Sequence, residues 1–424
     1  MRKLFVALLA FVLAMGVLPA CDSDKPVTIT VVSMFYENSA ADKDYNRDNF
    51  VNAYTAFEQS TGHTVKDVST KSGETWKKKV NDDFKNGSDP DVLYFFTGAD
   101  AEEFVKAGKV VPIRDIQRSY PDYAANMRSA LLPVTAGDKY AVPVSGYWEG
   151  LYVNKKVLTE CGVDFPGANY TWEQFLLDCA KIKGAGKIPI SCALGMYPHY
   201  IFEYFTFNNG DMGNHLTLPA AENDAAFDKW TAGLEDIKEL YEAGYFHEDA
   251  LAADDDDKAT EIDLLMTQNE AAFMIDGSWK ASFFQNNAED IEDFMVTFVP
   301  SKGEGRKTTE LIGGLSMGYY ITKKAWNDRA KRKACVDFVM HMTSDEVVTS
   351  FGALSITALK GGIKPPDNPD ALVTSILKMT NDYTGVMEAV QDLLDRDKRT
   401  ELFAAIKDIL AGSMSAEDAV RKVL

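Results

Sequence analysis

The chain is poor in the two side chains that build most metal and redox sites. Its 424 residues include only five cysteines and five histidines. No two cysteines have the Cys-x-x-Cys spacing of structural zinc and thiol redox motifs, and no histidine lies near a cysteine at the spacing of a zinc site. The sequence therefore predicts neither a metal ion nor a cofactor.

Positive charge is also scarce. The 44 basic residues are outnumbered by 64 acidic ones, which gives a formal net charge of −20. Nucleic-acid binding depends mainly on cations that neutralise phosphates, so this balance opposes it. We expect no nucleic-acid partner.

Long apolar runs are absent after the first twenty residues. The run at 4–17 follows Arg2 and Lys3 and is shorter than the roughly 20 residues of a spanning helix. Leu18-Pro19-Ala20-Cys21 follows it and resembles a bacterial lipobox. We therefore expect a signal peptide at 1–20, a lipid on the thiol of Cys21 and a tether at 21–26. An ordinary signal peptide and a short membrane anchor are the alternatives.

The other four cysteines are Cys161, Cys179, Cys192 and Cys335. A disulfide among the first three is compatible with an exported protein, but spacing alone cannot assign a pairing. Buried free thiols are an equally good interpretation.

A chain of this length is long for one hydrophobic core, so two lobes are expected. Alternating strand and helix patterns predict an α/β fold. A strand at 27–33 precedes a helix with apolar residues at 50, 53, 54 and 57 and a stop at Gly62. A second helix at 75–84 precedes an apolar strand at 92–96.

The stretch 139–158 has a strand pattern at both ends and a different residue pattern in its middle. Its two ends have the residue pattern of strands, and residues 145–150 between them contain Tyr147, Trp148 and Glu149 flanked by glycines. Adjacent aromatic residues in an extended chain point to opposite faces, so one core cannot bury both. We interpret this stretch as a crossing between two lobes. A bulge or turn with one aromatic residue in the core is the alternative.

Polar and aromatic residues also follow the predicted strands, where open α/β sheets place ligand sites. Tyr36 and Glu37 follow the first strand, and Asp100 follows the strand at 92–96. Asp100 can cap the next helix or accept a ligand hydroxyl. Tyr197 and His199 are expected in a loop before an aromatic helix at 201–207.

Two tryptophans have different expected roles. Trp172 follows the predicted N-cap Thr171 and belongs to an apolar helical stripe, so we place it in the core. Trp279 follows the strand 271–275 and the turn Asp276-Gly277. On its own this pattern indicates another core residue.

Four ordered segments resemble one protein family. The segments 87–92 (GSDPDV), 139–158, 171–175 (TWEQF) and 269–279 are similar to motifs of the family 1 extracellular solute-binding proteins of ABC sugar importers, a group that includes maltose-binding protein. The resemblance extends over nearly all of the chain after the signal segment. It implies a monomeric carbohydrate-binding lipoprotein on the outer side of the cell membrane, or in the periplasm, that is not an enzyme and delivers its ligand to a permease.

The family fold has two discontinuous lobes joined by a hinge of crossing strands. Applied to this chain, the resemblance implies an N-lobe from 27–145 and 315–351 and a C-lobe from 146–314 and 352–424. The crossings would lie near Gly146, Gly314 and Gly352.

The resemblance also implies a sugar site between the lobes. Trp279, Trp148 and Tyr147 would stack on sugar rings, and Glu37, Asp100 and Glu149 would accept hydroxyl hydrogens. Tyr36, Tyr197, His199 and Gly314 complete the expected lining.

Three other functions remain open from the residues alone. A polyamine-binding protein would use the same aromatic and acidic residues. A glycoside hydrolase would use two of Glu37, Asp100 and Glu149 as its catalytic pair. A sensor or adhesin of the same fold would have no permease partner.

Overall fold

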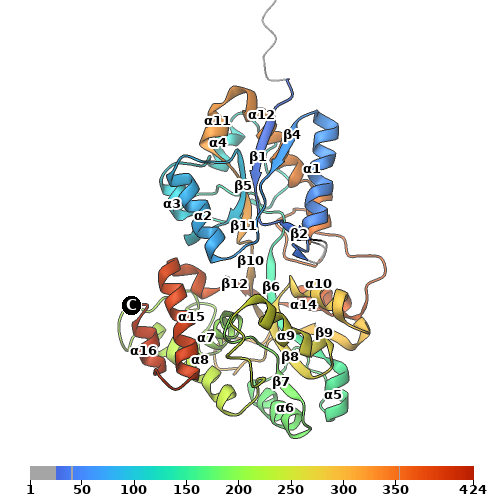
Figure 1. The fold of residues 1–424 in the computed structure, drawn as a ribbon, viewed down its shortest axis with the longest axis vertical. Coiled ribbons are helices and arrows are strands. Elements are labelled where there is room, and N and C mark those ends of the chain that lie inside the picture. Colours follow the sequence, from blue (N-terminus) through green and yellow to red (C-terminus); the bar gives the residue numbers. More distant parts are fainter. Residues whose placement is uncertain (1–24, 40–41, 353) are drawn as a thin grey trace, which may run out of the picture.

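The computed structural model describes residues 25–39, 42–352 and 354–424. The predicted signal peptide and Cys21 lie outside the described residues. The chain forms two α/β lobes, one above the other, with β6 and β10 between them in Figure 1. The predicted α/β class is confirmed.

The N-lobe is built on a four-stranded sheet in the order β11-β5-β1-β4. The strand β1 pairs in parallel with β4 and β5, and β11 pairs antiparallel with β5. All four strands come from the two segments that were predicted to build this lobe. Their bounds are Thr28–Val32 (β1), Thr64–Asp67 (β4), Val92–Phe96 (β5) and Met317–Ile321 (β11).

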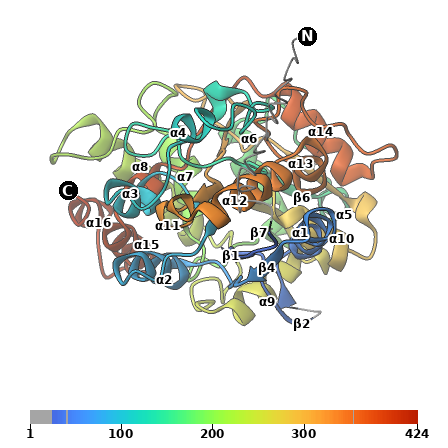
Figure 2. The same ribbon diagram turned by 90° about the horizontal axis from the view of Figure 1, so that it is seen from above.

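Helices pack on both faces of this sheet. In Figure 2, seen from above, α12 lies between α1 on one side and α2 and α3 on the other. The helix α1 buries Phe50 and Phe57 and ends at Gly62, whose φ of 74° is left-handed, as the sequence predicted. The N-lobe helices are α1 (Arg47–Thr61), α2 (Glu74–Lys85), α3 (Ala99–Lys106), α4 (Ile113–Gln117), α11 (Lys323–Asn327), α12 (Arg329–Met342) and α13 (Asp345–Gly352). A short hairpin of β2 (Glu37–Ser39) and β3 (Asp42–Lys43) precedes α1.

The C-lobe sheet has the order β12-β10-β6-β8-β7, and β9 also pairs with β6. The central strand β6 runs antiparallel to β8, β9 and β10. It pairs with β10 at its first residues and with β9 at its last ones. The bounds are Tyr147–Asn154 (β6), Ile188–Ile190 (β7), Ala271–Gly277 (β8), Phe294–Thr297 (β9), Glu310–Gly314 (β10) and Gly385–Met387 (β12).

The helices of the C-lobe surround its sheet. The helix α6 begins as predicted: the Thr171 side chain accepts a hydrogen bond from the Gln174 backbone N–H, and Trp172 is buried with its ring edge-on to Phe205. The C-lobe helices are α5 (Lys155–Cys161), α6 (Trp172–Gly184), α7 (His199–Asn208), α8 (Ala225–Glu242), α9 (Asp256–Thr267), α10 (Lys280–Asn287), α14 (Ala371–Asp382), α15 (Arg396–Leu410) and α16 (Ala416–Arg421).

Two local predictions were wrong. The helix α7 begins at His199, so His199 and Tyr200 lie in a helix and not in a loop. Pro198 precedes its first residue, and proline's fixed φ suits a helix start. The strand expected before the first crossing is reduced to an isolated bridge between Val142 and Tyr319. Instead, β6 begins at Tyr147 and includes the aromatic pair.

The first two crossings between the lobes lie side by side. Gly314 at the end of β10 pairs with Tyr147 at the start of β6. A Cβ on Gly146 would stand only 2.3 Å from the Gly314 carbonyl oxygen and 2.6 Å from that of Ile356. Only glycine fits at position 146 without displacing backbone.

The chain after the predicted third crossing at Gly352 contacts both lobes. Ala358 and Leu359 belong to the N-lobe core, and the Arg128 N–H donates to the Ala358 carbonyl. Leu354 and Ile356, which follow Gly352, pack instead against the C-lobe core, to which α14 from Ala371 also belongs.

All four described cysteines, Cys161, Cys179, Cys192 and Cys335, are free and buried. Each thiol lies in a hydrophobic core, which is one of the two alternatives left open by their spacing. Within the described ranges, no helix combines the length and the apolar character that crossing a bilayer requires.

Candidate binding site between the lobes

Four aromatic side chains gather on the C-lobe at its junction with the N-lobe. The Trp279 ring centroid lies 6.1 Å from that of Tyr147 and 5.5 Å from that of Tyr200, and Tyr197 lies 6.4 Å from Tyr200. We call these four residues the aromatic cluster. All four residues are half-buried. They come from β6, the turn before α10, and the start of α7.

The position of Trp279 follows from the end of β8. Gly277 pairs with Glu149 of β6, and the chain then turns into α10. A Cβ on Gly277 would stand 2.2 Å from the six-membered ring of Trp279. The tryptophan ring therefore lies directly over a glycine, which leaves it no room to move inward.

Trp148 lies on the opposite side of β6. Its side chain is fully buried, packs near Tyr152 and donates a hydrogen bond of 2.6 Å from Nε1 to the Leu354 carbonyl. Side chains alternate along a strand, so Tyr147 and Trp148 point to different faces. The structure brings Tyr147 to the aromatic cluster and places Trp148 in the C-lobe core, contrary to its expected stacking role.

Glu149 shares the Tyr147 face but is almost completely buried beneath the aromatic cluster. Its carboxyl group is hydrogen-bonded to that of Glu203 on α7, and Gln391 donates to Oε1 of Glu203. Burial raises the pKa of both glutamates well above the ordinary value. If both were ionised, Glu149 Oε2 and Glu203 Oε2 would have no donor. Either a proton or a cation beside the pair would offset this cost.

Asp100 lies in the first turn of α3, but it does not cap the helix. Its carboxylate forms ion pairs with Lys77 at 2.8 Å and with Arg399 at 3.0 Å. Burial acts to raise the pKa of Asp100, but the two cations outweigh it and hold that pKa below its usual value. A ligand hydroxyl would have to compete with both cations.

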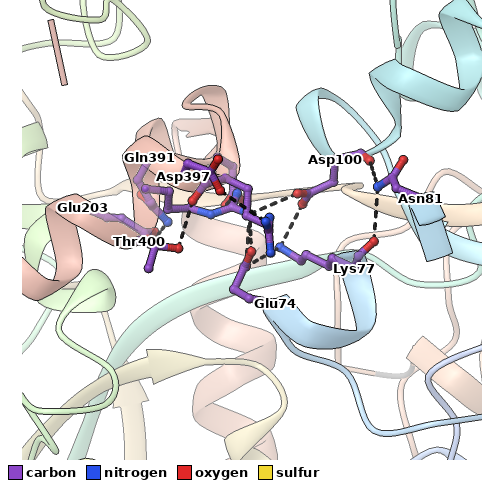
Figure 3. A network of polar contacts seen from close by, with 11 residues as sticks. Glu74, Lys77, Asn81, Asp100, Glu203, Gln391, Asp397 and Thr400 are labelled. Carbon is purple, nitrogen blue, oxygen red and sulfur yellow. Dashed lines mark hydrogen bonds and ion pairs between the residues drawn. The ribbon is translucent and has the colours of Figure 1, made fainter. Parts of the chain in front are cut away.

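Arg399 belongs to α15 of the C-lobe, so its contacts join the two lobes. It binds Glu74 and Asp100 of the N-lobe at 3.0 Å each, and Asp392 of its own lobe at 3.3 Å. Figure 3 shows Glu74, Lys77 and Asp100 turned toward one another at this junction, with Gln391 and Glu203 on the other side. A second ion pair between the lobes joins Lys71 to Asp256 at 2.5 Å.

Of the remaining predicted residues, two lie on the N-lobe and two lie beside the aromatic cluster. Glu37 is exposed in β2 and pairs with Arg47 at 3.5 Å, while the Tyr36 carbonyl accepts from the Asp44 N–H. His199 packs against Tyr200 and Phe403. Burial first, and then Lys77 and Arg399, lower the pKa of His199 to about 3, so it is neutral. Gly314 lies in the hinge beside Tyr147.

Several residues near the aromatic cluster escaped sequence reasoning. Glu203 was detectable as the one acid within the apolar helix pattern at 201–207, and Asp276 as a polar residue at the end of a buried strand. Tyr45 carried no signal. It is 48% exposed on the N-lobe, between β3 and α1. Beside it, burial raises the pKa of Asp44 to about 6.

No metal-binding arrangement is found in the part of the chain that the structure describes. There, no group of three or more histidine, cysteine, aspartate or glutamate side chains is placed to hold an ion. The chemistry of the junction is that of aromatic faces and carboxylates.

Comparison with solved structures shows the same fold throughout the chain. A structure described as a chitin oligosaccharide binding protein has a TM-score of 0.78 at 20% identity, and the match covers 94% of this chain and 97% of that one. The GacH receptor of Streptomyces glaucescens has a TM-score of 0.73 at 18% identity, with 94% and 97% covered. The maltose/maltodextrin-binding domain MalE of Bdellovibrio bacteriovorus has a TM-score of 0.66 at 17% identity, with 93% and 97% covered. The predicted two-lobe periplasmic-binding-protein fold is confirmed.

No curated protein matches the sequence. The family model described as bacterial extracellular solute-binding protein matches residues 43–349, which is most of the chain and includes the aromatic cluster. The chain therefore belongs to the bacterial extracellular solute-binding proteins, as its motifs predicted.

Proposed function

We propose that this protein captures an oligosaccharide between its lobes and delivers it to the permease of an ABC importer. The observation that carries the proposal is the aromatic cluster at the junction of the lobes. A flat aromatic ring covers the apolar face of a sugar and leaves the hydroxyl edge to polar groups. Half-buried rings side by side suit a ligand of more than one sugar unit.

The ligands of the structural neighbours support this class of solute. Their descriptions name chitin oligosaccharide, acarbose and maltotriose. These ligands belong to those proteins, and identities of 20% or less carry over the fold alone. Agreement between the neighbours and the aromatic cluster favours a carbohydrate over other solutes.

In the proposed complex, Trp279 and Tyr147 provide the main stacking faces, with Tyr200 and Tyr197 extending the surface. Tyr45 approaches from the N-lobe. Asp276 and Glu149 supply negative charge beside the rings, and Tyr36, Glu37, His199 and Gly314 remain proposed as outer lining. Asp100 acts in lobe closure through Arg399.

Ligand binding closes the lobes by a shift of population. A ligand that contacts Trp279 on one lobe and Tyr45 on the other stabilises the closed form relative to the open one. The adjacent crossings at Gly146 and Gly314 are the natural hinge because their backbones are in direct contact.

The contacts of the carboxylates favour a binding protein over a glycoside hydrolase. Glu149 and Glu203 are hydrogen-bonded to each other, whereas a retaining glycosidase needs carboxyl groups about 5 Å apart and an inverting one needs more. Asp100 is held by Lys77 and Arg399. No two of the three acids considered for a hydrolase are free to act as a pair.

The remaining parts of the proposal concern location and partners. Cys21 would carry a lipid that holds the protein at the outer face of the membrane, next to the permease. The protein would act as a monomer, because one chain contains both walls of the site.

Thermal shift assays with a panel of oligosaccharides test the proposal. A sugar at a hundredfold excess over its Kd stabilises the fold by about 2.7 kcal/mol, which is readily detected. We expect at least one oligosaccharide to raise the melting temperature and to lose this effect in Trp279→Ala. A panel of neutral, amino and acidic oligosaccharides without any stabilising member would contradict the proposal.

A further inference from the structure

The carboxylates around the aromatic cluster outnumber the cations available to them. Lys280 is shared between Asp263 and Asp276. Arg399 and Lys77 are shared among the acids of the network between the lobes, which are Glu74, Asp100 and Asp392. Each of these three cations therefore serves more than one acid.

Glu149 and Glu203 receive no cation at all. Neither has a lysine, arginine or histidine within ion-pairing distance in the described ranges of the chain. Both side chains are more than nine-tenths buried, and one oxygen of each has no donor when the pair is ionised. Two buried carboxylates without a countercharge are costly, so either a proton or another cation must lie close to them.

These carboxylates lie next to the rings of the aromatic cluster. Glu149 is two residues after Tyr147, on the same face of β6, and Glu203 is three residues after Tyr200, one turn along α7. Asp276 accepts a hydrogen bond from the Trp279 side chain. Three rings from three elements thus each have a carboxylate beside them.

Such an arrangement suits a positively charged group. Aromatic faces attract an ammonium ion through their negative π surface, and nearby carboxylates add to that attraction. A neutral sugar hydroxyl can donate to a carboxylate, but it brings no charge to offset the excess.

We propose that the preferred ligand carries at least one ammonium group, and that it is an oligosaccharide with free amino groups. This inference rests on the proposed function and specifies its substrate class. The ammonium group lies over the faces of Tyr147, Tyr200 and Trp279. Asp276 supplies countercharge, and the ammonium ion takes the place of the proton that Glu149 and Glu203 otherwise keep. Glu149 is then a specificity-determining residue, because it lies on the same face of β6 as Tyr147 and belongs to the buried acid pair.

Calorimetry on the folded protein tests this inference with four probes of similar length. These are an oligomer of glucosamine, the matching oligomer of N-acetylglucosamine, a neutral glucose oligomer and spermidine, in a near-neutral buffer. We expect the glucosamine oligomer to bind about tenfold more tightly than its acetylated counterpart, as one cation–π contact of moderate strength provides.

Each other outcome has a definite meaning. Equal or tighter binding of a neutral oligomer would overturn the amino preference and leave the proposed function intact. Binding of spermidine alone would overturn both, because no sugar would then be recognised. Failure of all three oligosaccharides would likewise overturn both.

Variants identify the acid responsible. Glu149→Gln keeps the shape of the side chain and removes its charge. The affinity for the glucosamine oligomer, divided by that for the N-acetylglucosamine oligomer, should therefore fall toward one. Glu173→Gln makes the same change on the exposed first turn of α6 and should leave the ratio unchanged. Asp276→Asn serves as the second test variant if Glu149→Gln does not fold. An unchanged ratio in a folded variant at either position would overturn the role assigned to that residue.

Discussion

Arg399 of the C-lobe donates a hydrogen bond of 3.0 Å to Asp100 of the N-lobe. Its side chain is only 3% exposed, and the same guanidinium group also binds Glu74. A buried cation on one lobe is therefore held by two carboxylates of the other. This contact joins the lobes in the arrangement that the structure shows, independently of any ligand.

Removing this contact should open the ligand-free protein. Arg399→Gln loses the ion pairs with Asp100 and Glu74, which we expect to weaken closure by about 1 to 2 kcal/mol, allowing for the partial exposure of Glu74. Small-angle scattering without ligand should show a larger radius of gyration than for the natural protein. Arg396→Gln is the matched control, since Arg396 is three residues away and pairs only with its neighbour Asp397 among the described residues. Identical scattering curves for natural protein and Arg399→Gln would argue against the closing role.

Gly146 should tolerate no side chain. In Gly146→Ala the new methyl group would meet the carbonyl oxygens of Gly314 and Ile356 and force the hinge backbone apart. Overpacking of this kind costs about 1 to 3 kcal/mol of unfolding free energy. Gly167→Ala provides the control, because a Cβ there meets nothing within 4 Å. Chemical denaturation measures both variants, and equal stability would show that the hinge relaxes without cost.

Trp279 and Trp172 should respond in opposite ways to the same substitution. Trp279→Ala removes an aromatic face from the proposed site and should weaken sugar binding by about 1 to 3 kcal/mol, by analogy with other stacked rings. Trp172→Ala removes a buried ring beside Phe205 and should instead cost about 3 to 5 kcal/mol of stability. Melting temperature and sugar affinity, measured for both, separate the two roles. A Trp279→Ala protein that binds sugar normally while folded would remove Trp279 from the site.

The acid pair should make stability depend on pH. Burial raises the pKa of Glu149 and Glu203 in the folded state, so the native protein keeps a proton that the unfolded chain releases above about pH 4.3. Stability therefore falls as the pH rises from that value through the raised pKa. The facing acids Asp276 from β8 and Asp392 from η4 (Val390–Leu393) act in the same direction on Glu149.

The test of this dependence is Glu149→Gln, which removes one titrating group of the pair. Between mildly acidic and mildly alkaline buffer, the variant should lose less unfolding free energy than the natural protein. Glu173→Gln should follow the natural protein. Parallel pH profiles for all three proteins would mean that the pair does not bind the extra proton.

Lipid anchoring is tested at Cys21, which lies outside the described residues. Cys21→Ser removes the thiol to which the lipid would be attached. The variant should leave the membrane fraction or remain unprocessed, and immunoblots of fractionated cells measure both. Normal processing together with membrane retention would contradict the lipoprotein prediction.

The sequence alone determined most of the local structure and the family. Apolar periodicity located the helices α1, α2 and α12, and the caps at Thr171 and Gly62 are visible as residue types. Their signals are local: a periodic face or a capping side chain acts within one or two turns. The sequence also predicted that Tyr147 and Trp148 cannot share one core, because alternation along a strand depends on nothing outside it.

Only the tertiary structure decided which of these two residues faces the site and which faces the core. The partners of Trp148 and Glu149 come from Leu354 and Glu203, which lie far away in the sequence. The same is true of Asp100, whose cation Arg399 is 299 residues away. A carboxylate's charge state and availability depend on what is packed against it, and no local pattern records partners that are brought together by folding.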